Sequence, residues 1–260
     1  MNKRLKGQVR SILPRALRRH RILAGPLRGS SIVTSWHDYP AAILGRTERA
    51  LLDYFARNVS KGETWLDIGA HYGYTAIALS KLVGNSGRVF AFEPMLNSSG
   101  CISRTRFLNK FSQLTIIPMG LGNCADLTID SLCTVRGMID STLQDTTGFK
   151  ESFLVSRLDW LWPRISGTDP QIHGVKIDVQ GMEIKVLEGM ADVIMKYRPK
   201  LLVEIHEGVS RPKLLEVIAS LGYKTHALVI EPLPGETEPL YADNRTYGFL
   251  PGEVELISRA

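Results

Sequence analysis

Groups that can accept a proton or bind a cation stand at or just after the ends of four β-prone runs in this 260-residue chain. These groups are Asp67, Glu93, Asp178, Glu204 and His206. The carboxyl ends of parallel strands meet at one edge of a sheet, where α/β proteins bind their ligands, so we expect these side chains to share one crevice. Carboxylates beside an imidazole suit the recognition of hydroxyl groups and proton transfer near neutral pH.

A glycine loop, Gly69 to Gly73, follows the first of these runs and precedes an apolar stretch, Thr75 to Val83, long enough for a helix. The order of strand, loop and helix opens a βαβ unit and places backbone N–H groups at the end of a strand. Glycine lets a ligand come close to this backbone. Glu93 follows about 20 residues beyond the loop, where an acid accepts the hydroxyls of a ribose. Together these features predict a cofactor that contains a nucleoside.

The loop itself narrows the choice of cofactor. A dinucleotide site needs a second glycine where His71 stands, and the chain has no Gly-x-x-x-x-Gly-Lys-Ser/Thr phosphate loop. The Asp-x-Gly-x-x-x-Gly pattern resembles the S-adenosylmethionine (SAM) site of Rossmann-like methyltransferases. The residues expected to contact SAM are Asp67, Gly69, Ala70, His71, Tyr72, Gly73, Glu93, Pro94 and Gly120.

Strands alternate with helices along the chain, which predicts a mostly parallel sheet covered on both faces. The expected strands are 64–67, 88–92, 114–119, 127–129, 152–155, 174–179, 201–205, 223–230 and 247–250. The expected helices are 47–57, 75–83, 97–109, 157–162, 182–197 and 212–221. Residues 120–149 are rich in Gly, Thr, Ser and Asp and predict a long excursion from the sheet, a kind of segment that often serves as a functional lid.

Positive charge is concentrated at the N-terminus. Residues 1–28 hold nine of the 32 Lys and Arg and no acid, which leaves 23 bases against 26 acids elsewhere. We expect residues 1–30 to form a basic arm, either disordered or amphipathic, that could contact anionic lipid or a partner. Residues 31–260 are expected to form the catalytic domain. Aromatic residues are not interleaved with these bases, which disfavours a single-strand nucleic-acid site.

The chain has no apolar run of 18 residues, so no membrane-spanning helix is expected. Its three cysteines, Cys101, Cys124 and Cys133, lack Cys-x-x-Cys spacing, which is typical of reduced bystanders. These features predict a cytoplasmic protein, in contact with a membrane surface if the arm binds lipid.

Three blocks of sequence resemble the FkbM family of SAM-dependent methyltransferases over roughly residues 45–230. They are Leu66 to Tyr74 with Phe90 to Pro94, Val175 to Glu183 with Leu187-Glu188-Gly189, and Val203 to His206. The resemblance implies a class I methyltransferase fold, with a seven-stranded sheet whose last strand is antiparallel. It also implies methyl transfer from SAM, which becomes S-adenosylhomocysteine, to a hydroxyl of a sugar, glycolipid or polyketide-type product. The family usually has Asn at the position of His71 and Glu at that of Gln180.

Transfer to an aliphatic hydroxyl needs a base to take its proton. Strand alternation places Glu204 and His206 on one face, beside Asp178 if their strands are neighbours. We predict His206 as the base, with Glu204 or Asp178 orienting it. A capping role for His206 and a structural role for Asp178 stay open. The three side chains could also hold Mg²⁺ or another divalent ion, although a metal-free site is favoured.

The chain has three alternative interpretations. A non-catalytic module with this fold could bind a partner or membrane through the basic arm. A nicotinamide oxidoreductase is disfavoured by His71, and a nucleic-acid methyltransferase by the absence of an Asn/Asp-Pro-Pro-Tyr sequence after Asp178.

Overall fold

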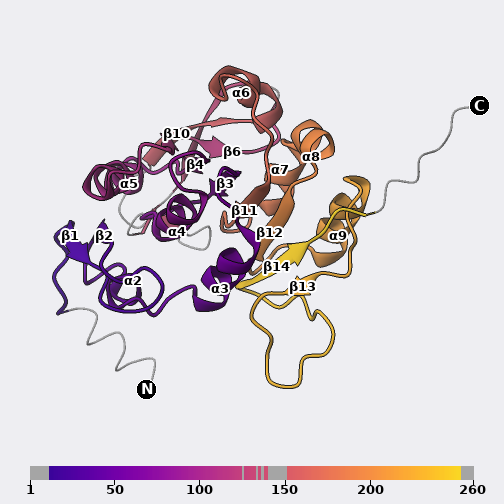
Figure 1. Cartoon of the computed structure of the whole chain (residues 1–260). Coiled ribbons are helices and arrows are strands. Elements are labelled where there is room, and N and C mark those ends of the chain that lie inside the picture. The colour runs from indigo at the N-terminus through magenta and orange to yellow at the C-terminus, as the bar shows by residue number, and fades with distance from the viewer. Residues whose placement is uncertain (1–11, 125, 133, 136–137, 140–150, 253–260) are drawn as a thin grey trace, which may run out of the picture.

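The computed structural model describes residues 12–124, 126–132, 134–135, 138–139 and 151–252. At its centre is a seven-stranded sheet with the order β13-β14-β12-β11-β3-β4-β5 (Figure 1). The strands from β12 to β5 are parallel, and β14 is antiparallel to both of its neighbours. The bounds are β3 (Thr64–Ile68), β4 (Arg88–Phe92), β5 (Leu114–Ile117), β11 (Gly174–Ile177), β12 (Lys200–Ile205), β13 (Leu228–Val229) and β14 (Arg245–Phe249). The predicted sheet, including its antiparallel last strand, is confirmed.

Helices cover both faces of the sheet. On one face lie α3 (Arg49–Asn58), α4 (Tyr74–Val83) and α5 (Leu96–Asn109), and on the other α6 (Leu158–Ile165), α7 (Glu183–Glu188), α8 (Ala191–Tyr197) and α9 (Arg211–Ser220). Strand side chains alternate between two apolar cores, so Trp65 packs with the first group and Leu66 with the second. Asp67 therefore lies on the face covered by α3 and α4.

The single helix expected over residues 182–197 is wrong, because α7 and α8 are separated at Gly189 and Met190. The Asp159 carboxylate, from α6, accepts hydrogen bonds from Asp192 N (3.2 Å) and Val193 N (2.9 Å) and so caps the start of α8. Gly189 also lies against another segment, where an added Cβ would come within 1.8 Å of the Gly122 carbonyl oxygen. Tertiary contacts thus interrupt a helix whose apolar periodicity continues across the break.

The strand expected over residues 223–230 is also shorter than predicted. Only Leu228 and Val229 pair with β14, and Tyr223 forms a single bridge to Pro251. Between these points the Tyr241 hydroxyl donates to Thr225 O and accepts from Ala227 N (3.2 Å). A side chain therefore satisfies backbone groups that a longer strand would have paired.

The excursion after β5 contains a second sheet of three strands, in the order β6-β10-β7 (Figure 1). The bounds here are β6 (Gly120–Leu121), β7 (Thr128–Leu132), β8 (Thr134–Val135), β9 (Met138–Ile139) and β10 (Glu151–Ser156), of which β8 and β9 pair with each other. The expected strands near residues 127–129 and 152–155 are present. Residues 140–150 lie outside the described part.

In place of the arm expected up to residue 30, β1 (Arg18–Arg21) and β2 (Ser31–Thr34) form an antiparallel hairpin, followed by α2 (Pro40–Leu44). Ile22 and Leu27 are buried, and Val33 N donates to Thr105 Oγ1 of α5 (2.9 Å), so this segment is fixed to the domain. Residues 1–11 of the expected arm lie outside the described part. None of the helices in the described residues has the length and apolarity needed to span a membrane.

The contact at Gly189 predicts a sharp difference between two glycine substitutions. Gly189→Ala should destabilise the fold by roughly 1–3 kcal/mol or more, because its Cβ would overlap the backbone of Gly122. Gly100→Ala, in α5 with open space around its Cβ, should be neutral or stabilising by up to about 1 kcal/mol. Urea unfolding of both variants checks this, and equal stability of the two would contradict the close approach.

Candidate functional site

A cavity of about 550 Å³ opens at the carboxyl ends of the parallel strands. Its wall comes from the segments that follow β3, β4, β5, β11 and β12, with a further side from the second sheet. The lining includes Ile68, Gly69, His71, Glu93, Pro94, Met95, Met119, Gly120, Asp130, Phe153, Asp178, Gln180, Gly181, Lys185, Glu207 and Gly208. A cavity of this size and place is suited to a nucleoside-sized ligand together with a small acceptor.

The glycine loop owes its form to close backbone packing. Gly69 has φ +78°, and a Cβ there would stand 1.8 Å from the Asp178 carbonyl oxygen. His71 also takes a left-handed conformation (φ +49°), which Asn adopts more easily than most residues. Burial lowers the pKa of His71 to about 4, so its ring is neutral at the cavity wall. The loop therefore presents backbone and a neutral ring to a ligand.

Glu93 lies at the cavity wall and is only 5% exposed. Its two carboxylate oxygens accept hydrogen bonds from His71 N (2.8 Å) and Met95 N (2.9 Å). Burial raises the pKa of Glu93 to about 7, although these two N–H groups act in the opposite direction. Glu93 thus ties the loop after β3 to the segment after β4 and titrates near neutral pH.

Asp67 lies below the loop rather than in the cavity. It is fully buried, accepts from Thr75 Oγ1 (2.7 Å) and pairs with Lys176 Nζ (3.4 Å), the residue opposite it on β11. Lys176 Nζ also donates to Asp178 Oδ2 (3.1 Å) and Gly69 O (3.2 Å). This buried ammonium group thus links Asp67, Asp178 and the glycine loop.

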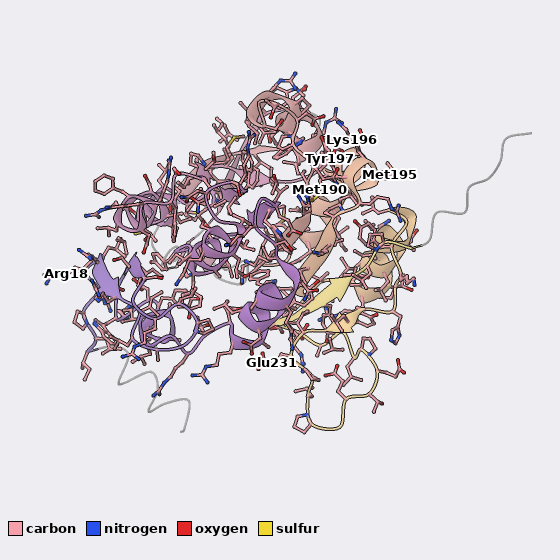
Figure 2. All side chains as sticks on the ribbon, in the orientation of Figure 1. Arg18, Met190, Met195, Lys196, Tyr197 and Glu231 are labelled. Atoms are coloured by element: carbon pink, nitrogen blue, oxygen red, sulfur yellow. The ribbon has the colours of Figure 1, made fainter. Side chains whose placement is uncertain are left out.

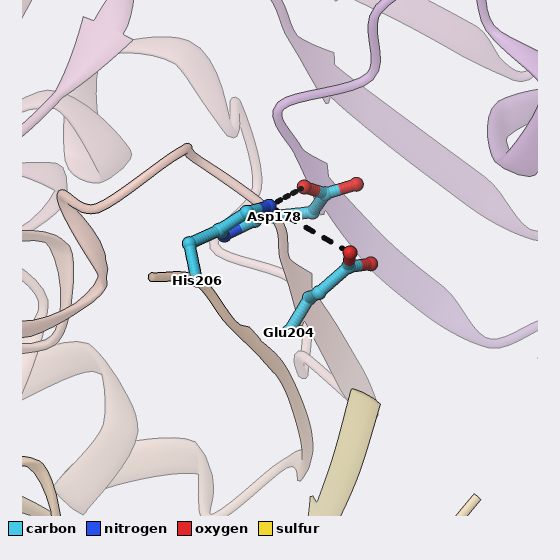
Figure 3. A group of neighbouring side chains, drawn as sticks. All are labelled: Asp178, Glu204 and His206. Carbon is cyan, nitrogen blue, oxygen red and sulfur yellow. Dashed lines mark ion pairs between the residues drawn. The ribbon is translucent and has the colours of Figure 1, made fainter. Parts of the chain in front are cut away.

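Asp178, Glu204 and His206 converge as strand alternation predicted (Figure 3). His206 Nε2 lies 3.4 Å from Asp178 Oδ1 and 3.6 Å from Glu204 Oε1. Figure 3 shows the imidazole and the Glu204 carboxylate side by side on the end of β12, with Asp178 reaching in from the end of β11. Both carboxylates therefore face the same nitrogen.

Glu183, which the sequence did not single out, and Gln180, noted only as a departure from the family pattern, complete the surroundings of His206. Glu183, fully buried at the start of α7, accepts from His206 Nδ1 (2.6 Å) and from Gly181 N (3.0 Å). Gln180 Nε2 lies 2.8 Å from His206 Nε2, and Gln180 lines the cavity whereas His206 does not. Glu183 is thus a better orienting group than Glu204 or Asp178, and Gln180 stands between the histidine and the cavity.

Burial and neighbouring charges shift the pKa values of Glu204, His206 and Asp178. Burial, reinforced by Asp178, raises the pKa of Glu204 to about 7. Burial alone would lower the pKa of His206, but the hydrogen bond to Glu183 and the charge of Asp178 raise it. Burial would raise the pKa of Asp178, yet Lys176 and His206 hold it below its usual range.

The same three side chains offer one ligand atom each within 4.8 Å of one another, a spacing that could hold a divalent cation. His206 would contribute Nε2, with Nδ1 fixed by Glu183, as is usual for a metal-bound imidazole. Lys176 already supplies a positive charge to Asp178, which weakens the demand for an ion here.

The expected site residues divide into two sets. Those that line the cavity are Gly69, His71, Glu93, Pro94, Gly120 and Asp178, and those outside its lining are Asp67, Ala70, Tyr72, Gly73, Glu204 and His206. Ala70 and Gly73 shape the loop, since Ala70 N donates to Phe92 O (3.0 Å) and Gly73 is the N-cap of α4. The second set supports the cavity from behind.

The sheet order and the cavity at its carboxyl edge define a class I SAM-dependent methyltransferase fold, with SAM as the cofactor. The model of the methyltransferase FkbM domain matches residues 67–225. The chain therefore belongs to the FkbM methyltransferase family, as its sequence blocks indicated. None of the curated proteins matches the sequence.

Solved structures with similar folds include an FkbM methyltransferase from Methylobacillus flagellatus, with 17% identity and a TM-score of 0.49 over 80% of this chain and 52% of that one. This chain thus spans about half the length of that protein. An rRNA methylase from Streptococcus thermophilus has 13% identity and a TM-score of 0.49, over 81% and 99% of the two chains. Fibrillarin from Aeropyrum pernix, solved with bound SAM, has 11% identity and a TM-score of 0.47, over 90% and 82%.

The raised pKa of Glu93 predicts that SAM affinity depends on pH. Ribose hydroxyls donate best to an ionised carboxylate, so protons compete with SAM and the affinity should fall by up to about ten-fold per pH unit below about pH 7. Glu93→Gln should bind SAM weakly, with little pH dependence. Glu207→Gln, at another point of the cavity, should keep the native pH dependence. Calorimetry across the neutral range checks this, and a native affinity that does not vary with pH would contradict the role of Glu93.

Proposed function

We propose that this methyltransferase transfers a methyl group to a hydroxyl oxygen of a sugar, glycolipid or polyketide-type natural product. The observation that carries the proposal is the buried pair of His206 and Glu183 directly behind the cavity. A hydroxyl must lose its proton as its oxygen is methylated, and a histidine held by a buried carboxylate is suited to accept that proton.

SAM would occupy the part of the cavity nearest the glycine loop. Glu93 would accept its ribose hydroxyls, and the backbone from Gly69 to His71 would lie against its amino-acid end. When bound there, SAM supplies an activated methyl group on a sulfonium. The acceptor would lie toward Gln180, between the strand ends and Phe153 of the second sheet.

Glu183 orients the base in this proposal. In neutral His206, Nδ1–H donates to Glu183 and Nε2 carries the lone pair that receives the proton. The imidazolium that forms is stabilised by Glu183 and by the nearby Asp178 and Glu204. Because these groups raise the pKa of His206, turnover should increase as pH rises through that raised value and the imidazole becomes neutral.

Gln180 would control access to the base. Its amide now occupies the hydrogen-bonding position of His206 Nε2, so an acceptor hydroxyl must displace it or act through it. The residue has φ +54° and precedes Gly181 (φ +99°), and its side chain reaches His206, just after β12. The Glu usual in the family at this position would bring a further carboxylate to the histidine, whereas Gln brings none.

The His206–Glu183 pair predicts separate effects on turnover and SAM binding. His206→Ala should lower kcat about 10²- to 10⁴-fold, the usual contribution of a general base, while SAM affinity changes little. Glu183→Gln should lower kcat less and shift the pH profile to lower pH, because the imidazolium loses its partner charge. His226→Ala, at an exposed histidine, serves as the matched control. Release of S-adenosylhomocysteine with a panel of hydroxyl acceptors is the assay, and native turnover in His206→Ala would remove His206 as the base.

A metal-free mechanism predicts that chelation has no effect. Because Lys176 already neutralises Asp178, we expect treatment with EDTA to leave both SAM binding and turnover within about two-fold of the untreated enzyme, below 1 kcal/mol. Loss of turnover on chelation, restored by Mg²⁺ or Mn²⁺, would instead assign Asp178, Glu204 and His206 as ligands.

A binding module without catalysis is the alternative function. It would bind SAM without releasing S-adenosylhomocysteine in the presence of any hydroxyl acceptor. The His206–Glu183 pair behind the cavity favours catalysis over this alternative.

A further inference from the structure

Exposed bases lie on the hairpin, in the last turn of α4, and on or just after the second half of α5. They are Arg18, Arg19, Arg21, Arg28, Lys81, Arg104, Arg106 and Lys110, and we call this surface the basic face. Figure 1 shows β1, β2 and α5 on the same side of the molecule, and in Figure 2 Arg18 lies at its outer limit.

Hydrogen bonds join the three elements that carry these bases. Ser31 N donates to Asn109 Oδ1 of α5 (2.9 Å), and Asn109 Nδ2 donates back to Ser31 O (2.7 Å). Arg19 Nε donates to Ser31 Oγ (3.3 Å), and Lys81 Nζ, from the last turn of α4, donates to Ser30 Oγ (3.5 Å). The bases are therefore held on one fixed surface rather than spread along a loose segment.

The chain segments that carry most of these bases contain no acid. Residues 12–37 contain five Arg and no acid, and residues 94–125 contain two Arg, one Lys and no acid. Within the described ranges, no base of this face forms a salt bridge, whereas Lys196, Arg211 and Lys213 on other surfaces do. The face thus keeps its full charge for a partner.

An exposed aromatic ring lies among these bases. Phe107 is 83% exposed on α5, and Arg104 and Lys110 each lie three positions from it, which makes them its neighbours on the helix surface. Bases around a protruding apolar side chain are the arrangement that binds the boundary of an anionic lipid surface. Phe107 is the one exposed aromatic among the described residues of this face, too few for the stacked platforms that bind single-stranded nucleic acid.

The basic face also lies away from the cavity. Helix α5 begins at Leu96, just after the carboxyl end of β4, and ends at Asn109, just before β5 starts. Its second half is therefore at the edge of the sheet opposite the cavity. A nucleic-acid acceptor bound here would not reach the site, whereas a membrane bound here would leave the cavity open.

We infer that the basic face docks the protein on the surface of an anionic membrane, with Phe107 inserted between the headgroups. The interaction is separate from methyl transfer and does not depend on the acceptor. It would concentrate the enzyme at the membrane with its cavity turned away from the bilayer.

Co-sedimentation of the full chain with vesicles tests this inference. The protein should bind vesicles of phosphatidylcholine mixed with phosphatidylserine, but not phosphatidylcholine alone, and should be released as salt rises from about 0.1 M to about 1 M. The triple variant R104E/R106E/K110E should lose about 100-fold or more in partitioning. Phe107→Ser should weaken binding several-fold while the salt dependence remains.

The matched control reverses three exposed bases elsewhere, R164E/K213E/K224E. Both triple variants lower the formal net charge from +6 to 0, so only the position of the charge differs. SAM binding should be native in both, and R18E/R21E on the hairpin gives the same test should the α5 variant fail to bind SAM. Equal losses of vesicle binding in both triple variants would overturn the inference. So would a native protein that does not bind anionic vesicles. So would binding of a single-stranded RNA through these bases in the absence of vesicle binding.

Discussion

The site depends on one buried ammonium group. Lys176 Nζ lies between Asp67 (3.4 Å) and Asp178 (3.1 Å) and donates to the carbonyl of Gly69. It thereby links two neighbouring strands to the glycine loop that follows one of them. Burial alone would lower the pKa of Lys176, but these carboxylates raise it, so the group stays charged. Breaking such a buried pair by removing one partner typically costs about 3–5 kcal/mol, since an uncompensated charge remains.

The charge of Lys176 also influences which of the nearby carboxylates stays ionised. Asp178 stays ionised beside it, while burial, reinforced by Asp178, raises the pKa of Glu204 to about 7. His206 is drawn between them and held from behind by Glu183. One acid thus remains a fixed negative charge and another titrates near neutral pH, which is the kind of separation that places proton transfer in an enzyme site.

The N-terminal segment contacts the glycine loop of the site at one end and carries part of the basic face at the other. Tyr39 packs against the rings of His71 (5.2 Å between centroids) and Tyr72 (6.3 Å), so it covers the glycine loop. The hairpin before it is hydrogen-bonded to α5 and carries the basic face. The positive charge counted in the sequence is therefore part of the folded domain from Arg18 onward, and the membrane interaction that we infer would act through the same segment that shapes the cofactor loop.

The amino-acid sequence alone predicted the sheet, most helix positions and the edge where the functional groups meet. Those features follow from local signals: apolar periodicity, a glycine loop, and acids at strand ends. It also predicted that Glu204 and His206 share a face, because side-chain alternation is a property of any strand. Three further features emerge only once the chain is folded: Asp67 pairs with Lys176, Glu183 hydrogen-bonds to His206 Nδ1, and α7 and α8 separate at Gly189. Each of these depends on strand register or on packing between elements far apart in the chain, which no local pattern encodes.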